Sequence, residues 1–253
     1  MKIALYQGPS PFGAADVALA VVARVLAAAG AMGARMAVFP EVFLPGYNQD
    51  GIAEAAQPLG GDWCARLSAM AKAARCGVTV GFAERAGAAV YNAAVTYGAD
   101  GALLAQYRKV QLYGAREKAI YLPGDRLCTF DLEGRRAALL ICYDIEFAPH
   151  VRALAERRVE VILVPTANML PFTHVSRLTV PSQAVNHAVS IVYANYCGTE
   201  GDLIYCGGSL IVGPDGAMLA EAGAGEVLLI ADLDVGAPDP ALSAQVRDYR
   251  AVE

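Results

Sequence analysis

Three residues that can do chemistry stand directly after segments that predict strands: Glu41, Lys109 and Cys142. A cysteine thiolate attacks acyl carbon atoms, a nearby ammonium group lowers the pKa of the thiol, and a carboxylate takes up the thiol proton. Because α/β folds present their sites at strand ends, the three side chains are candidates for one reaction centre. Taken singly, each has a structural explanation: a capping carboxylate, a surface lysine and a buried cysteine. Together they predict nucleophilic catalysis by a cysteine.

The composition predicts a folded protein with few charges. The chain has 253 residues, of which 56% are hydrophobic and 18% charged, and its formal net charge is −5. So much apolar surface offsets the entropy of ordering and excludes intrinsic disorder. The acidic balance argues against a nucleic-acid partner, because such proteins normally carry a basic face. In a chain this poor in charge, acidic and basic residues that follow apolar strands are harder to explain as surface decoration.

The first residues and the most apolar stretch both argue against export and membrane insertion. Residues 1–7 predict a short strand, whose apolar run is too short for a signal peptide and lacks a cleavage site. Residues 18–39 are interrupted by Arg24 and Arg35, whereas a membrane span needs about 20 unbroken apolar residues. We therefore expect a soluble, cytoplasmic protein with no membrane partner.

The six cysteines and three histidines are too scattered for a metal site or a disulfide framework. No two cysteines have the spacing of zinc ligands. A Cys–His protease is disfavoured, because His150, His174 and His187 lie outside any protease signature. We expect these histidines on the surface or satisfied within helices, and we expect neither a metal nor an organic cofactor.

Helix and strand patterns alternate through the first two thirds of the chain, and hairpin signals follow. This alternation predicts an α/β fold with mixed sheets, and near-continuous apolar strands indicate sheets covered on both faces. No linker or repeat interrupts the pattern, so residues 1–253 are expected to form one domain. Helices are expected at 14–31, 62–75, 149–158 and 176–189, and strands at 1–7, 36–39, 78–82, 91–97, 103–107, 137–141, 159–164, 190–196, 208–212 and 226–233.

The segments that carry the three candidate residues resemble the signature segments of the carbon–nitrogen hydrolase (nitrilase) superfamily. They are Phe39-Pro40-Glu41, Tyr107-Arg108-Lys109 and Leu140-Ile141-Cys142-Tyr143-Asp144, in the family's order and separations. Within the family, the chain looks like the aliphatic amidases, such as 5-aminopentanamidase and R-stereoselective amidase. The resemblance implies a four-layer α-β-β-α sandwich of two mixed sheets flanked by helices. It also implies assembly into a homodimer or a larger homo-oligomer.

The resemblance implies a role for each of the three residues. Cys142 is the nucleophile that forms a thioester, and Glu41 is the general base. Lys109 stabilises the oxyanion together with the backbone N–H of Tyr143. The residue types support these roles, because an ammonium group and a nearby helix N-terminus both favour the thiolate.

A further carboxylate, Glu117, precedes the Pro-Gly-Asp turn at residues 123–125. In the family, a glutamate before this turn hydrogen-bonds the catalytic lysine or positions the substrate, and we assign Glu117 that catalytic role. The alternative is a solvated charge on a helix face, paired with Lys118.

The substrate class follows from two residues near the nucleophile. Tyr143 stands where nitrilases typically have tryptophan, which favours amides over nitriles. Glu146 stands where acid-recognising relatives carry arginine, so it is expected to repel anionic substrates and attract cationic ones. The resemblance thus implies hydrolysis of small aliphatic amides, with an amino group, to a carboxylate and ammonia. Alternatively, Glu146 ties down a neighbouring backbone group or arginine.

Other readings of the site stay open at the level of the sequence. The chain departs from the family pattern near the nucleophile and on the later helix, which leaves room for a non-catalytic binding protein on the same fold. A nitrilase or an N-carbamoyl amide hydrolase is the alternative within the family. The departures from the family pattern are Gln111, Ala148, Pro149, Gln183 and Asn186.

Four residues besides Glu146 are expected to bind the substrate. They are Tyr47, Tyr113, Asn168 and Met169.

Overall fold

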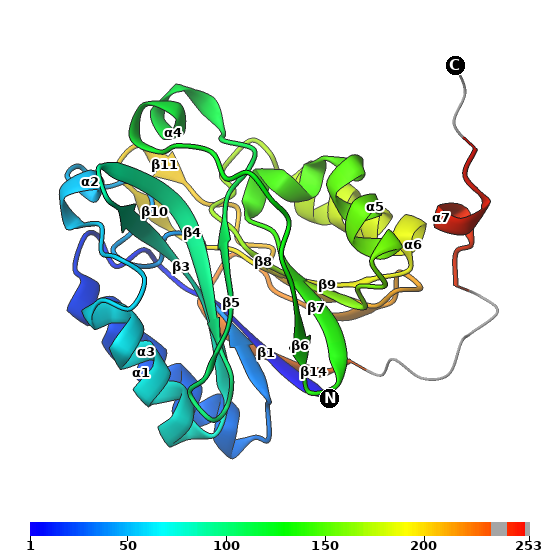
Figure 1. Ribbon diagram of the computed structural model, residues 1–253, viewed down its shortest axis with the longest axis horizontal. Helices are drawn as coiled ribbons and strands as arrows, with labels where there is room; N and C mark the ends of the chain where they lie inside the picture. The colour runs from blue at the N-terminus through cyan, green and yellow to red at the C-terminus, as the bar shows by residue number, and fades with distance from the viewer. Residues whose placement is uncertain (234–241, 251–253) are drawn as a thin grey trace.

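Two six-stranded sheets lie face to face, and helices cover the outer side of each (Figure 1). The structure is a computed structural model that describes residues 1–233 and 242–250. Helices α1 (Ala15–Ala31) and α3 (Asp62–Ala74) pack on one sheet, and α5 (Ala148–Glu156) and α6 (Val180–His187) pack on the other. The expected four-layer α-β-β-α arrangement is therefore confirmed.

The first sheet carries two of the three candidate residues at its strand ends. Its strands run in the order β14-β1-β2-β3-β4-β5, with β1, β2 and β3 parallel and the remaining pairings antiparallel. The strands are β1 (Lys2–Gln7), β2 (Met36–Val38), β3 (Gly77–Ala86), β4 (Ala89–Tyr97), β5 (Leu103–Arg108) and β14 (Val227–Asp232).

The second sheet carries the cysteine at the end of an inner strand. Its order is β13-β12-β9-β8-β7-β6, with β7, β8 and β9 parallel. The strands are β6 (Thr129–Leu132), β7 (Arg135–Leu139), β8 (Val161–Pro165), β9 (Ser190–Ala194), β12 (Leu210–Val212) and β13 (Met218–Glu221).

Strand β1 shows how the sequence builds a sheet that is buried on both faces. Ile3 and Leu5 belong to the core between the sheets, whereas Ala4 and Tyr6 belong to the core under α1 and α3. Successive side chains of a strand point to opposite faces, so a continuous apolar run fills both cores. This explains why the strands read as unbroken apolar segments.

The expected helices and strands are present, with ends shifted by a few residues. The helix expected at 176–189 begins instead as a wider, π-helical turn, η2 (Val175–Thr179), which continues into α6. Two short strands, β6 and β13, complete the second sheet and were not expected. Other elements without a sequence prediction are α2 (Ile52–Ala55), α4 (Gly114–Ile120), η1 (Cys142–Glu146), β10 (Thr199–Glu200), β11 (Leu203–Ile204) and α7 (Gln245–Asp248).

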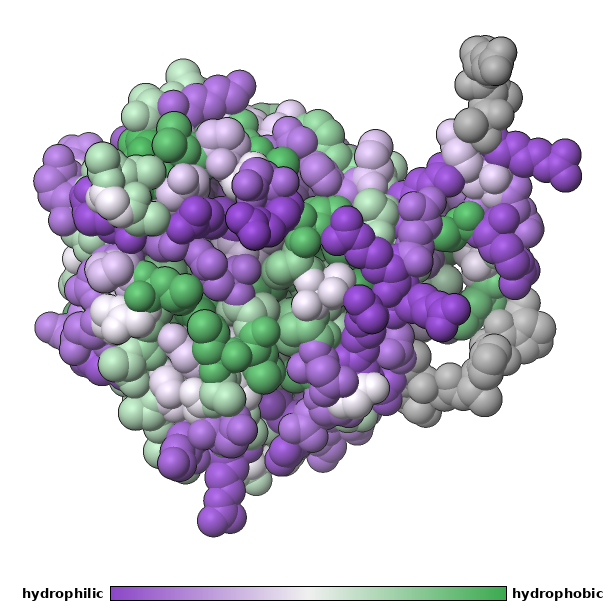
Figure 2. Space-filling model, viewed as in Figure 1, coloured by the Kyte–Doolittle hydropathy of each residue, from purple (hydrophilic) through white to green (hydrophobic). Residues whose placement is uncertain are grey.

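The surface is mixed in character. In the space-filling view, hydrophilic side chains cover much of the visible face, and a hydrophobic area lies over β3 to β5 (Figure 2). Among the described residues, no helix has both the length and the apolar character needed to span a membrane.

Candidate active site

Glu41, Lys109 and Cys142 come from three strand ends and are brought to one place by the two facing sheets. Glu41 follows β2, Lys109 follows β5, and Cys142 begins η1 just after β7. The backbone N–H of Glu41 donates to the carbonyl of Thr166, at 3.3 Å, at the end of β8. This bond joins the two sheets at the level of the site.

One glycine lets the Glu41 segment lie close to the first sheet. A Cβ atom on Gly81, in β3, would come within 2.4 Å of the Val42 nitrogen and 2.7 Å of the Glu41 Cα. No side chain fits there, because Cβ atoms do not approach backbone atoms so closely without displacement. Gly81 is therefore part of the reason that Glu41 occupies its position over β3.

Lys109 joins two carboxylates in the interior. Its Nζ lies 2.6 Å from Glu41 Oε1 and 2.7 Å from Glu117 Oε1. The three side chains are buried, with exposed fractions of 0% for Lys109 and Glu41 and 3% for Glu117. Since removing a charge from water is costly unless it is paired, the ammonium group and its carboxylates must stabilise one another. The alternative for Glu117, a solvated charge paired with Lys118, is wrong.

Further hydrogen bonds hold the two carboxylates, but they leave one oxygen free. The Tyr47 hydroxyl donates to Glu117 Oε1 at 2.7 Å, and the Tyr113 backbone N–H donates to Glu117 Oε2 at 2.8 Å. Asn92 Nδ2 donates to Glu41 Oε1 at 2.6 Å. Among the described residues, Glu41 Oε2 is buried and has no hydrogen-bond partner.

Burial sets the protonation of these groups. It raises the pKa of Glu41 to about 7, against the attraction of Lys109 and with the repulsion of Glu117. Burial by itself would lower the pKa of Lys109, but Glu41 and Glu117 outweigh it and hold that pKa well above its usual range. The lysine therefore stays a cation at neutral pH, while Glu41 exchanges protons there.

Cys142 is held in an unusual backbone conformation and keeps its proton at rest. Its φ angle is +46°, in the left-handed region that side chains disfavour and that occurs at reactive sites. Burial and then Glu41 raise the pKa of the thiol well above its usual range, although Lys109 acts in the opposite direction. The expected lowering by Lys109 is thus present, but a net lowering of the thiol pKa is wrong.

Asp144 ties the nucleophile segment to the lysine segment. Its Oδ2 accepts the Tyr107 hydroxyl at 2.8 Å and the Ile141 backbone N–H at 3.1 Å. Its Oδ1 accepts the backbone N–H of Gln111 at 2.8 Å. Residues on both sides of Lys109 and Cys142 are therefore fixed by one buried carboxylate.

A cavity of about 220 Å³ opens beside the cysteine. All five residues that the sequence predicts as substrate-binding line it. The full lining is Tyr47, Tyr113, Cys142, Tyr143, Glu146, Ala167, Asn168, Met169, Phe172 and His174.

The cavity wall is aromatic with one carboxylate. The ring of Tyr113 packs edge-on against Tyr143 at 5.4 Å and against Phe172 at 6.0 Å. Burial raises the pKa of Glu146, and His174 opposes this shift. Within residues 1–233 and 242–250, the Glu146 side chain has no hydrogen bond or ion pair, so the structure does not show it tying down a neighbouring group.

Several residues of this region were missed in the sequence. Asn92 and Asp144 are fully buried polar residues beside apolar strands, and that contrast is a usable signal. Phe172 and His174 lie on a loop after β8, and nothing in their sequence context indicates the cavity. His174 is exposed, as expected for the histidines, and it also lines the cavity.

The departures on the helices lie within regular structure. Ala148 and Pro149 form the first turn of α5, where proline is tolerated. On α6, Gln183 is buried, and Asn186 Oδ1 accepts a hydrogen bond from Gln245 at 3.4 Å. None of these residues lines the cavity.

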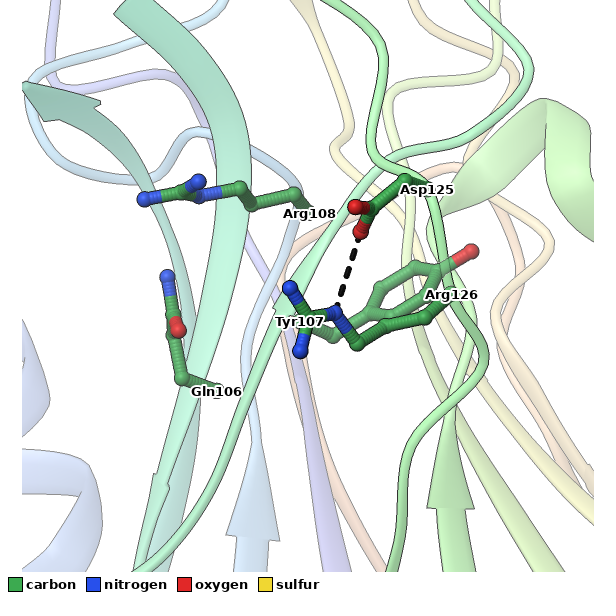
Figure 3. A pocket seen from close by; sticks show the side chains of 5 residues that line it. All are labelled: Gln106, Tyr107, Arg108, Asp125 and Arg126. Atoms are coloured by element: carbon green, nitrogen blue, oxygen red, sulfur yellow. Dashed lines mark hydrogen bonds and ion pairs between the residues drawn. The ribbon is translucent and has the colours of Figure 1, made fainter. Parts of the chain in front are cut away.

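A different and larger cavity, of about 300 Å³, lies beside β5, between this strand and the segment with Asp125 and Arg126 (Figure 3). It is lined by Gln106, Tyr107, Arg108, Asp125 and Arg126, and Arg126 Nε pairs with Asp125 at 3.0 Å. No cysteine lines it, so we place the candidate active site in the smaller cavity, beside Cys142.

Comparisons with known proteins point to the same chemistry. The family model described as carbon-nitrogen hydrolase matches residues 2–238. A protein described as hydrolase in pqqF 5'region, from Pseudomonas protegens, is 39% identical over 239 residues, or 92% of this chain and 83% of that protein. The (R)-stereoselective amidase of a Pseudomonas sp. is 37% identical over 214 residues, or 84% and 76%.

A solved structure shows the same similarity in three dimensions. It is the amidase from Nesterenkonia sp. AN1, in a variant with acrylamide added at the active site cysteine. It matches with a TM-score of 0.89 and 34% identity, and the match covers 99% of this chain and 96% of that one.

Proposed function

The chain belongs to the carbon–nitrogen hydrolase family, and we propose that it is an amidase that hydrolyses small aliphatic amides to a carboxylate and ammonia. One observation carries the proposal. A fully buried ammonium group, on Lys109, bridges two carboxylates beside a cysteine that lines a mainly apolar cavity. The similarity to an (R)-stereoselective amidase and to the Nesterenkonia amidase supports the same activity.

In the first half of the reaction, Cys142 becomes acylated. Glu41 takes the thiol proton, and the sulfur atom attacks the carbonyl carbon of the amide. Lys109 Nζ and the Tyr143 backbone N–H stabilise the negative oxygen of the tetrahedral intermediate. The C–N bond then breaks, the nitrogen takes the proton from Glu41, and ammonia leaves a thioester on Cys142.

In the second half, water replaces the sulfur. Glu41 takes a proton from water as the oxygen attacks the thioester carbon, and Lys109 again stabilises the oxyanion. The C–S bond breaks, Glu41 returns its proton to Cys142, and the carboxylic acid product leaves and loses its proton to solvent. A pKa near 7 suits Glu41 for both proton transfers, because the group accepts and releases protons at neutral pH. Glu117 holds Lys109 in place throughout.

We propose that the preferred amides bear an amino group. Glu146 lines the cavity, and no described residue forms an ion pair with it. Aromatic side chains such as Tyr113 and Phe172 line the same cavity, and their faces attract cations. Asn168, Met169 and Tyr47 complete the wall around the acyl chain.

An ammonia-release screen tests the activity. Amides, nitriles and N-carbamoyl compounds are compared with the native protein, with Cys142→Ala and with Cys128→Ala as a control for loss of a half-buried cysteine. We expect ammonia from amides with the native protein and Cys128→Ala, and none with Cys142→Ala. Comparable turnover of a nitrile or a carbamoyl compound would select the alternative hydrolases. Binding of amides without turnover would select the non-catalytic protein.

A substrate pair tests the role of Glu146. The ratio of kcat/KM for 5-aminopentanamide and pentanamide is measured for the native protein and for Glu146→Gln. An ionic hydrogen bond contributes about 1.5–3 kcal/mol, so we expect the ratio to fall about 10-fold or more. Glu156→Gln, which changes an exposed carboxylate on α5, is the matched control. An unchanged ratio in Glu146→Gln would remove the amino-group preference.

The remaining features of the proposal rest on the family resemblance and on composition. We propose a cytoplasmic homodimer or larger homo-oligomer, formed by a single domain over residues 1–253, that needs no cofactor. Light scattering of the purified protein tests the assembly, and activity in the presence of a chelator tests the cofactor requirement.

A further inference from the structure

Asn92 is a buried polar residue that contacts two members of the candidate active site. It lies in β4, between apolar neighbours, and its side chain is fully buried. Its Nδ2 donates to Glu41 Oε1 at 2.6 Å, and its backbone carbonyl accepts the Lys109 N–H at 2.8 Å. Burying an amide in an apolar strand is costly unless its hydrogen bonds compensate. The contacts with Glu41 and Lys109 therefore explain why a polar residue is buried at this position of β4.

The hydrogen bonds of Glu41 are distributed unevenly between its two oxygens. Oε1 accepts both Lys109 Nζ and Asn92 Nδ2, each at 2.6 Å. Oε2 has no partner among the described residues. Donors stabilise negative charge on the oxygen they contact, so a proton that arrives at the carboxylate binds the other oxygen, Oε2.

The backbone around Glu41 is also held in place. The Tyr196 hydroxyl donates to the Glu41 carbonyl at 2.8 Å, and Gly81 brings the same segment against β3. Asn92 lies close to the Glu41 segment because its strand, β4, pairs with β3, where Ala83 is opposite Asn92. With its backbone and Oε1 both held, Glu41 has one free oxygen in one orientation.

We infer that Asn92 is a positioning residue, which fixes Glu41 so that Oε2 alone exchanges protons with Cys142, with the leaving nitrogen and with water. This inference rests on the proposed function. As a neutral amide, Asn92 holds Oε1 without adding a second cation beside Lys109, which would make Glu41 a weaker base. The titratable groups that interact with Glu41 are Lys109, Glu117 and Cys142 and the phenols of Tyr47, Tyr121, Tyr193, Tyr196 and Tyr205.

The test is the pH profile of kcat/KM on the best amide from the ammonia-release screen. The Asn92 hydrogen bond lowers the pKa of Glu41, so its removal in Asn92→Leu raises that pKa. Because Glu41 must be deprotonated to act as the base, we expect the acidic limb of the profile to move upward by about one pH unit. We also expect kcat/KM at neutral pH to fall about 10- to 100-fold.

Two further variants separate positioning from general damage to the fold. Thr96→Val removes another buried hydrogen bond of β4, between Thr96 Oγ1 and Thr79 Oγ1 at 2.9 Å, without touching Glu41. It is expected to leave the limb in place. Asn92→Asp keeps the shape of Asn92 but places a second carboxyl group beside Oε1, and it is expected to move the limb upward as well.

The inference is overturned if Asn92→Leu behaves like Thr96→Val, with an unmoved limb and a similar kcat/KM. If Asn92→Leu does not fold, an unmoved limb in Asn92→Asp overturns it equally. Failure of the proposed function gives a different result, because then the native protein has no amidase activity or Cys142→Ala retains it.

Discussion

Two neighbouring residues at the end of β5, Arg108 and Lys109, build very different ionic clusters. Arg108 lines the cavity drawn in Figure 3, and its Nε and guanidinium nitrogen donate to Glu84 at 2.9 and 2.7 Å. About a third of the Arg108 side chain is exposed, and Glu84 also accepts Gln106 Nε2. Each carboxylate oxygen of Glu84 therefore has a donor.

The Lys109 cluster faces the opposite side of the strand and is incomplete. One ammonium group serves two carboxylates, all three groups are withdrawn from water, and Glu41 Oε2 has no partner among the described residues. Burial without full compensation is what raises the pKa of Glu41 to about 7. A cluster whose hydrogen bonds are complete stabilises the fold, whereas one with an unpartnered basic oxygen can move protons.

Cavity size does not identify the active cluster. The cavity of about 300 Å³ beside Arg108 and another of about 470 Å³ beside β6 are both larger than the cavity of about 220 Å³ beside Cys142. The distinction depends on which cavity holds a nucleophile and a base with a perturbed pKa.

The largest predicted effect is that of Lys109→Met, which removes the cation and keeps the length of the side chain. Loss of one oxyanion donor lowers kcat about 10²- to 10³-fold, and loss of the partner of Glu41 adds to this. Ammonia release from the best amide measures the loss. If Lys109→Met retained more than a tenth of the native activity, the Lys109 cluster would not be the catalytic one.

We also predict that Lys109→Met changes the dependence of the free energy of unfolding on pH. Without Lys109, Glu41 is a buried carboxyl group with no cation beside it, so its pKa in the folded state lies above that in the unfolded state. The folded state then binds more protons, so its free energy of unfolding is highest at low pH and falls as pH rises. Urea unfolding at pH 5 and pH 8 is expected to show a larger loss at pH 8. Arg108→Met provides the control.

The second prediction concerns the native pH profile. Burial raises the pKa of Glu41 to about 7, and the base must be deprotonated in the free enzyme. We therefore expect kcat/KM to fall about tenfold per pH unit below about pH 7 and to level off above it. Steady-state kinetics from pH 5 to 9 provide the measurement, and Glu146→Gln should keep the same acidic limb. A limb near the ordinary pKa of a glutamate would show that burial does not control Glu41.

The sequence predicted the reactive residues better than it predicted their energetics. Glu41, Lys109 and Cys142 were identifiable because each follows a predicted strand within a segment that resembles a family signature, and the strand ends converge in the fold. The direction of the pKa shift of Cys142 could not be predicted, because it depends on how completely the sheets exclude water around the sulfur atom. No spacing in the sequence reports that burial.

Contacts between residues far apart in the chain could also not be predicted from the sequence. Asn92 contacts Glu41 across 51 positions of the chain, through the pairing of β3 and β4. His174 reaches the cavity from a loop whose course depends on the packing of the second sheet. By contrast, the outer helices and most strands follow from apolar periodicity, which is local. The short strands β6 and β13 were not predicted, because four residues are too few to show a pattern of apolar residues.

The third prediction concerns the backbone that carries Glu41. Gly81→Ala places a Cβ atom 2.4 Å from the Val42 nitrogen, so the segment must move away from β3. We expect a loss of about 1–3 kcal/mol in the free energy of unfolding and a fall of about 10-fold or more in kcat/KM. Gly223→Ala is the control, because nothing lies within 4 Å of its Cβ position. Equal behaviour of the two variants would show that the close approach is unimportant.

The smallest effect on activity is expected for Arg108→Met. The guanidinium group contacts Glu84 and the face of Tyr91, at 3.8 Å, and it touches no residue of the cavity beside Cys142. Its removal leaves the buried Glu84 carboxylate with fewer donors, so we expect a loss of about 1–2 kcal/mol in stability. We expect kcat/KM to stay within about twofold of the native value, because the Lys109 cluster lies on the other side of β5. Urea unfolding and amide kinetics on the same preparation measure both quantities. A fall in activity as large as that of Lys109→Met would mean that the two clusters act as one, which would remove the distinction between a complete and an incomplete cluster.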